Sequence, residues 1–156
     1  MTALDALQHT LAGEHAAVYV YGVLGGRVSR EDSPDLARLI AEAYDVHRAR
    51  RGQLQTTITK LGGTPVAADV AYELTTPAET GPQLRREALG IEQRCATTYA
   101  AAVASTTGDN RRWAVLALDD AAVRGLGFGG KPEPFPGAGD LADLAVEQTP
   151  ATPAAE

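Results

Sequence analysis

Three side chains suited to metal binding or proton transfer occur where a helical repeat expects apolar residues. Glu14 lies in a stripe of Leu, Val and Tyr residues spaced three and four apart, and His47 lies in a similar stripe. Glu92 flanks a third stripe, in which the small Ala88 leaves room for a ligand or an ion. A buried carboxylate or imidazole needs a partner, because burial without one is costly. These positions therefore predict an interior polar or metal site.

Two kinds of interior site satisfy these groups. Two carboxylates and one imidazole from three helices suit a Zn, Mn or Fe ion whose open positions are filled by water. The alternative is a metal-free network in which Glu14 accepts hydrogen bonds from His47 and from Arg50 or Arg51, with Glu92 paired nearby. The sequence leaves both interpretations open. It identifies no catalytic residue, no substrate and no small-molecule ligand.

Other reactive residues have simpler interpretations. His15 follows a residue of the apolar stripe and can flank the site, although a surface or interface role is favoured because an isolated His is weak evidence for ligation. His9 is expected on the surface. Cys95 is the only cysteine, which excludes an internal disulfide and a cysteine-based zinc cage. We interpret it as a small core residue.

Apolar repeats predict four helices that must position these groups. Capping residues, prolines and glycines place the first two helices at about residues 3–25 and 34–61. The third begins near residue 82 and ends before a break at 106–108, and the fourth follows Asp109 as its cap and ends in the glycines at 125–130. Between the second and third helices, prolines, glycines and threonines occur without a helical period, so this stretch is a connection. The predicted helical bundle occupies residues 1–128. Residues 129–156 form a Pro-, Gly- and Ala-rich tail, for which we expect a short helix at 140–146 and disorder from residue 149.

Connection lengths indicate how the helices are arranged. Short connections make helices one and two, and helices three and four, antiparallel hairpins. A helix of about 25 residues is about 37 Å long. A stretch of about 20 extended residues reaches roughly 66 Å, so the middle connection can return along the whole bundle. The sequence therefore predicts an all-α, antiparallel four-helix bundle with a long crossover between helices two and three, which is the topology of ferritin-like folds.

The end of the first helix is apolar on nearly every side, from Val18 to Leu24. One pair of partner helices cannot cover such a surface, so something else must bury its outer face. A second subunit is the favoured cover, which predicts a homodimer. The alternative is that the connection containing Tyr72 and Leu74, together with the Phe135 segment, covers this face within one chain.

Parts of the sequence resemble an actinobacterial ferritin-like family of unknown function. The resemblance rests on the GEHAAVYVYG sequence at 13–22, the HRARR run that begins at His47, the AYEL sequence at 71–74, and Glu92. It implies a four-helix bundle, often dimeric, without an established activity. Ferritin-like enzymes hold two metals with inward Glu residues and Glu-x-x-His pairs. The resemblance thus implies metal ligands at Glu14, His47 and Glu92, with Asp120 as a fourth.

Composition and charge exclude several classes of protein. A chain of 156 residues fits one domain, and its net charge of −6 supplies no positive field for nucleic acid. The longest apolar run, residues 16–21, is far shorter than the roughly 20 residues that span a bilayer, so no membrane binding is expected. The amino terminus lacks the pattern of a secretory signal, which favours the cytoplasm. No Gly-rich phosphate loop or nucleophile elbow is present, which disfavours nucleotide-binding α/β enzymes and serine hydrolases.

Overall fold

The computed structural model describes residues 1–139, and its regular elements are four α-helices. They are α1 (Ala3–Arg27), α2 (Pro34–Lys60), α3 (Gly81–Ser105) and α4 (Gly108–Gly127). No strand occurs in this part of the chain, so the prediction of an all-helical protein with four helices is confirmed. The short helix predicted at 140–146 and the disorder predicted from residue 149 lie outside the described residues.

Local sequence explains where the helices begin. At the start of α1, the Thr2 hydroxyl accepts a hydrogen bond from the amide of Asp5, and the Thr2 amide donates to the Asp5 carboxylate. This reciprocal pair satisfies two of the amides that a helix start leaves without partners. Pro34 begins α2, where its missing N–H and fixed φ carry no penalty. Ser33 precedes it as predicted, but its hydroxyl makes no capping hydrogen bond.

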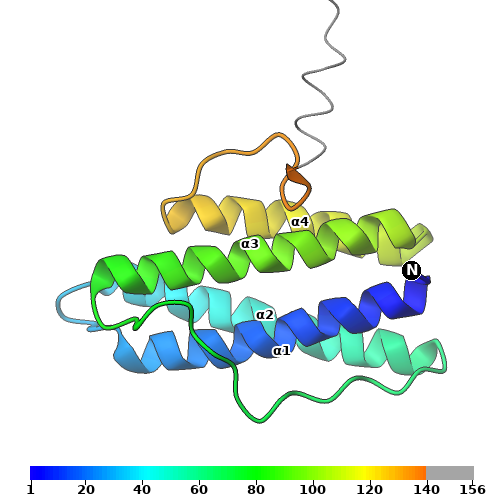
Figure 1. The fold of residues 1–156 in the computed structure, drawn as a ribbon, viewed down its shortest axis with the longest axis horizontal. Helices are drawn as coiled ribbons and strands as arrows, with labels where there is room; N and C mark the ends of the chain where they lie inside the picture. The colour runs from blue at the N-terminus through cyan, green and yellow to red at the C-terminus, as the bar shows by residue number, and fades with distance from the viewer. Residues whose placement is uncertain (140–156) are drawn as a thin grey trace, which may run out of the picture.

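The four helices lie side by side along one axis (Figure 1). Short turns join α1 to α2 at one end and α3 to α4 at the opposite end, so the chain reverses direction within each pair. The crossover segment (residues 61–80), which connects the two pairs, runs back along the outside of the bundle next to α1, as its length predicts. α1 packs against α2 and α3, and α3 also packs against α4.

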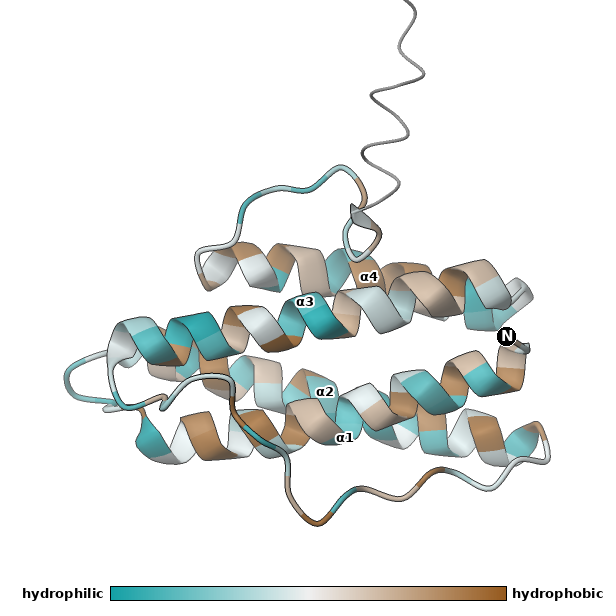
Figure 2. Ribbon diagram, viewed as in Figure 1, coloured by the Kyte–Doolittle hydropathy of each residue, from teal (hydrophilic) through white to brown (hydrophobic). Residues whose placement is uncertain are grey.

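Polar residues divide the apolar interior into two clusters. Figure 2 shows hydrophilic and hydrophobic residues alternating along each helix, as expected for helices with one buried face. A small cluster at one end contains Leu7, Leu11, Leu54 and Ile58. The larger cluster, rich in alanine, occupies the rest of the bundle. On α1 the fully buried Glu14 falls between the two clusters.

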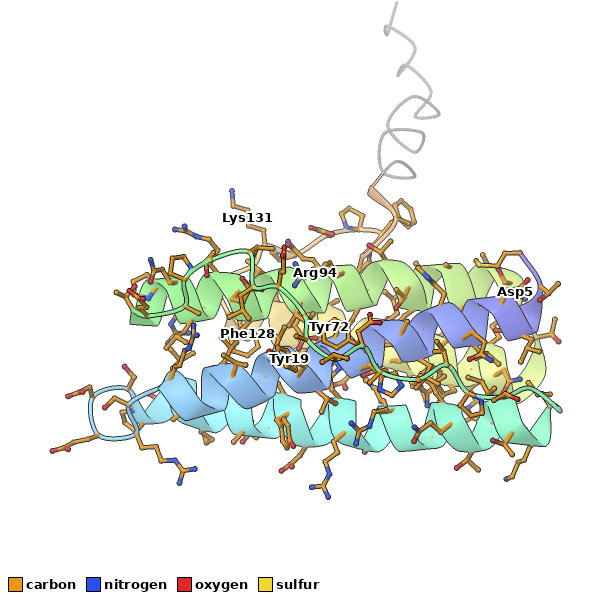
Figure 3. The ribbon with its side chains drawn as sticks, turned by 60° about the horizontal axis from the view of Figure 1, so that its bottom comes forward. Asp5, Tyr19, Tyr72, Arg94, Phe128 and Lys131 are labelled. Atoms are coloured by element: carbon orange, nitrogen blue, oxygen red, sulfur yellow. The ribbon has the colours of Figure 1, made fainter. Side chains whose placement is uncertain are left out.

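The crossover segment covers the outer face of α1. The side-chain amide of Gln8 donates to the carbonyl of Thr64 over 2.6 Å. Farther along, the rings of Tyr19 and Tyr72 lie 5.5 Å apart, and both side chains are visible where the segment crosses α1 (Figure 3). The crossover segment thus covers part of this face within one chain, as the alternative interpretation has it, while Tyr19 stays 37% exposed. The segment around Phe135 lies instead over α3 and α4.

None of the helices among the described residues is both long and apolar enough to cross a bilayer.

Candidate functional site

Polar side chains from all four helices meet inside the bundle, two from each helix. We term this set the core network. It comprises Glu14 and Tyr21 of α1, His47 and Arg50 of α2, Glu92 and Tyr99 of α3, and Asp120 and Arg124 of α4. All of them except Asp120 and Arg124 are buried. The helical repeat places each pair on the inward side of its helix, since the spacings are three, four or seven residues.

His47 lies between two carboxylates. Its Nδ1 atom is 2.8 Å from Oε2 of Glu14, and its Nε2 atom is 3.2 Å from Oε1 of Glu92. An ionised carboxylate only accepts hydrogen bonds, so each contact requires an N–H on the imidazole. With Glu14 and Glu92 ionised, both ring nitrogens of His47 donate and the imidazole carries a positive charge, which agrees with its raised pKa. The Tyr21 ring stacks on the imidazole with 5.3 Å between centroids, which adds favourable contact with the charge.

The remaining contacts of the core network connect Glu92 to Tyr99 through two arginines and an aspartate. Nε and Nη2 of Arg124 each lie 3.1 Å from Glu92, one on each carboxylate oxygen. Asp120 accepts hydrogen bonds from both Arg124 and Arg50. Arg50 in turn donates to the Tyr99 hydroxyl over 3.2 Å. A path of hydrogen bonds thus leads from Glu92 around to Tyr99.

Glu14 of α1 and Glu92 of α3 each accept a hydrogen bond from a tyrosine of the other helix. The Tyr99 hydroxyl donates to Oε1 of Glu14, and the Tyr21 hydroxyl donates to Oε1 of Glu92 over 2.6 Å. In both helices the tyrosine follows the glutamate by seven residues. The two helices therefore contribute the same pair of groups in opposite order along their axes, and each carboxylate is held by the tyrosine of the other helix.

The network places three acidic groups against three basic groups. The carboxylates are Glu14, Glu92 and Asp120, and the cations are protonated His47, Arg50 and Arg124. Their charges sum to zero. Charge balance matters here because an unpaired charge in a core costs several kcal/mol.

Burial and pairing shift the pKa values of these groups in ways that favour the charged forms. Burial lowers the pKa of His47, but its hydrogen bonds to Glu14 and Glu92 outweigh burial, so the pKa lies above its usual value of 6.5. Burial raises the pKa of Glu92, yet His47 and Arg124 bring it down to about 2. Burial also lowers the pKa of Arg124, and Glu92 and Asp120 raise it above its usual value.

The tyrosines and the cysteine remain protonated. Burial, followed by the charge of Glu92, raises the pKa of Tyr21 well above 10. Burial and the charge of Glu14 do the same for Tyr99. Burial and both glutamates raise the pKa of Cys95 well above 9, so its thiol is a core group without thiolate character. None of these three is activated as a base or nucleophile.

The structure brings some of the sequence-derived candidates together and separates others. Glu14, His47 and Glu92 are in direct contact. Asp120 reaches the network only through arginines, and its side chain is 49% exposed. Arg50 belongs to the network, whereas the partly exposed Arg51 takes no part in it.

His15 faces the crossover segment and lies outside the core network. Its Nε2 atom is 3.1 Å from the carbonyl oxygen of Val66, which only accepts, so this nitrogen donates. Its Nδ1 atom has no hydrogen-bond partner among the described residues. His15 thus helps to hold the crossover segment on α1.

The coordination expected for a metal ion is missing from the described residues. Among residues 1–139, no group of three or more His, Cys, Asp or Glu side chains is arranged to hold a metal. A His47 that donates from both ring nitrogens also has no free lone pair for a metal.

Sequence reasoning missed the hydrogen-bonding roles of Tyr21, Tyr99 and Arg124. Both tyrosines fit an apolar stripe, so the helical repeat assigned them to packing. Their common spacing of seven residues from a stripe glutamate is the signal that would have linked them. The sequence signal for Arg124 is weaker: this residue lies four residues after Asp120, on the same face of the helix.

Comparison with known proteins identifies relatives without an assigned activity. The family model described as a domain of unknown function (DUF4439) matches residues 6–140. The chain is similar to the crystal structure of a conserved hypothetical protein, rv2844, from Mycobacterium tuberculosis, with 30% sequence identity and a TM-score of 0.74. That similarity covers 81% of this chain and 95% of the mycobacterial chain. No curated protein matches the sequence.

Proposed function

The chain belongs to the DUF4439 family, and we propose that it is a non-catalytic binding or scaffold module whose metal-free core network fixes the register of its helices. One observation carries this proposal. Both nitrogens of His47 donate to carboxylates, so the group best suited to bind a metal is already a cation. The resemblance to ferritin-like folds belongs to the same proposal, with arginines and tyrosines occupying the interior where ferritin-like enzymes hold metal.

Charge balance supports this function over a metal centre. Metal binding at His47 requires the imidazole to lose a proton and the two glutamates to turn away from it. Glu92 would then give up contacts with Tyr21 and Arg124 that already satisfy it. A divalent cation would also meet the guanidinium of Arg124 at the same carboxylate, which is repulsive.

The proposed role of the network is to select one alignment of the helices. Buried ion pairs add little to stability compared with apolar residues, but a wrong pairing leaves charges buried alone. The hydrogen bonds from Tyr99 to Glu14 and from Tyr21 to Glu92 can form together in one register of α1 against α3. A fixed register keeps the exposed surfaces of the bundle in a constant shape, which a binding module requires.

Metal analysis of the full chain tests the proposal directly. Protein purified without a nickel step should contain far less than one transition metal per chain. A ligand that binds the folded state raises its melting temperature. If the chain binds no metal, addition of Zn²⁺, Mn²⁺ or Fe²⁺ should therefore leave the melting temperature unchanged. The variant His47→Gln serves as the control for metal bound elsewhere. Stoichiometric metal that raises the melting temperature of the wild type but not of the variant would overturn the proposal.

The homodimer expected from the sequence remains a proposal, but the surface proposed for the contact moves from α1 to α4. Val20 and Leu24 of α1 are buried in the core of the same chain, so they are unavailable to a partner. α4 instead exposes Leu116, Val123 and Leu126, which are 60%, 66% and 44% accessible. We propose this face for the contact between two copies. Light scattering should then give twice the chain mass for the wild type and the single-chain mass for Val123→Asp, with a monomeric wild type contradicting the dimer.

A further inference from the structure

A cavity of about 430 Å³ lies between α3 and α4, beneath the segment that follows α4. This roof segment (residues 128–139) runs back over α4 (Figure 1). The cavity walls are mainly apolar and include Leu89, Ala96, Ala121 and Leu126. Its volume falls in the range of roughly 300–1,000 Å³ that small-molecule sites occupy.

The roof is held in place at both ends. Phe128 is almost fully buried, and its ring lies 6.1 Å from that of Tyr21. At the other end, Gly137 has a φ of 71° and sits so close to α3 that a Cβ atom would lie 2.4 Å from the carbonyl of Ala96. Only glycine allows this approach. The roof is therefore built against α3 and leaves a preformed space between its two anchors.

Glu92 lines this cavity and, among the described residues of the lining, is the buried charged one. Its Oε1 atom accepts from Tyr21, His47 and Arg124, whereas Oε2 accepts only from Arg124. With one contact against the three at Oε1, Oε2 is the less occupied oxygen and can accept from one further donor. The cavity thus combines mainly apolar walls with one buried carboxylate oxygen that can take a further donor. The other polar residues of the lining are exposed, and they are Gln93, Thr97, Lys131 and Glu133.

The charges around Glu92 decide what kind of donor fits. His47 and Arg124 already bring two cations to this carboxylate, so a third cation would be repelled. An anion such as a carboxylate has no proton to donate to Oε2 and would meet a like charge in contact with it. The charged lining residues Lys131 and Glu133 are exposed and take no part in the hydrogen bonding of this oxygen, which accepts from Arg124. A neutral hydroxyl can donate one hydrogen bond without disturbing the charge balance.

We propose that the cavity binds a small apolar molecule bearing one neutral hydrogen-bond donor, an alcohol or a phenol. Its apolar part contacts the walls from α3 and α4, and its hydroxyl donates to Glu92. This inference rests on the binding-module function proposed above and gives that function a ligand class. It also places the ligand in contact with the core network, because Glu92 belongs to both.

Titration of the full ¹⁵N-labelled chain with three probes tests this ligand class. The probes are benzyl alcohol, benzyl methyl ether, which lacks the donor, and benzylamine, which is a cation at neutral pH. Benzyl alcohol should give saturable shifts at the amides of Ala96 and Ala121 and at the side-chain N–H groups of His47. Its dissociation constant should be roughly 2- to 10-fold lower than that of the ether, as one net hydrogen bond provides. Benzylamine should bind more weakly than benzyl alcohol.

Two variants make the result specific to the cavity. Ala122→Leu adds bulk to a partly exposed cavity wall and should abolish the shifts, whereas Ala41→Leu on the exposed face of α2 should preserve them. Equal binding of alcohol and ether, tightest binding of benzylamine, absence of saturation, or binding retained by Ala122→Leu would each overturn the proposal. Failure here is distinguishable from failure of the proposed function, because the metal analysis uses no organic probe.

Discussion

Replacing Glu92 by Gln tests the core network at the group with the most partners. Burial opposes ionisation of this carboxyl, but His47 and Arg124 favour it and bring its pKa from 4.5 to about 2. A tenfold change in proton affinity corresponds to about 1.4 kcal/mol. Ionisation of Glu92 therefore stabilises the folded chain at neutral pH by about 3 kcal/mol, and Glu92→Gln should lower the free energy of unfolding by that amount.

The effect of Glu92→Gln should depend on pH in a defined direction. The folded pKa lies below the unfolded value, so the stabilisation is fully present above pH 4.5 and is lost as the pH falls toward 2. Gln resembles the protonated carboxyl in shape and charge. Wild type and variant should therefore differ most at neutral pH and converge in strong acid, even though both lose stability there.

Urea unfolding followed by circular dichroism measures this difference across the pH range. Glu42→Gln is a matched control, because Glu42 pairs with Arg38 on the surface of α2 and its side chain is 59% exposed. A surface pair of this kind contributes about 0.5 kcal/mol or less. The reasoning is refuted if Glu92→Gln costs no more than Glu42→Gln at neutral pH, or if its cost is the same at pH 3 as at pH 7.

Further variants probe other parts of the structure. Tyr99→Phe removes a hydroxyl that both donates and accepts, and should lower the free energy of unfolding in urea by about 2 kcal/mol. Asp120→Ala leaves two arginines without their shared carboxylate, so sodium formate should raise its melting temperature more than sodium chloride at equal ionic strength. The raised pKa of His47 makes its stabilisation fully present below pH 6.5 and lost as pH rises through the folded pKa, so the free energies of unfolding of wild type and His47→Gln should converge in alkali. Gly137→Ala should displace the roof segment and speed hydrogen exchange in residues 128–139, while exchange in α1 stays unchanged.

The helical repeat was sufficient to predict the helices and the meeting of three polar residues. Glu14 and His47 each interrupt an apolar stripe, Glu92 flanks a third, and stripes of neighbouring helices face one another. The repeat fixes where a Cα atom lies, but not where the end of a long side chain reaches. Arg124 shows the difference, because its guanidinium extends inward to Glu92 and leaves its side chain 13% exposed.

The cover of α1 shows a second limit of sequence reasoning. The length of the crossover segment predicts that it returns along the bundle, but length does not say which helix it lies on. Docking depends on individual polar contacts, such as those of Gln8 with Thr64 and of Arg27 with the carbonyl of Pro77. Such contacts join residues about fifty positions apart and leave no periodic signal. The apolar surface at the end of α1 therefore indicated that some segment must cover it, but the sequence did not indicate which one.

The composition of the core explains why a charged layer is useful at its centre. Much of the larger cluster is alanine, including Ala17, Ala43 and Ala88, and small side chains form shallow ridges that fit a neighbouring helix in several registers. A slip of one turn, about 5.4 Å, would cost such a surface little. The same slip would part Glu14 from its tyrosine and Glu92 from its tyrosine at once, leaving both carboxylates with unsatisfied acceptors in the interior. Under the proposed function, the network supplies the discrimination between registers that an alanine-rich interior lacks, because its buried charges would lose their partners in a shifted arrangement.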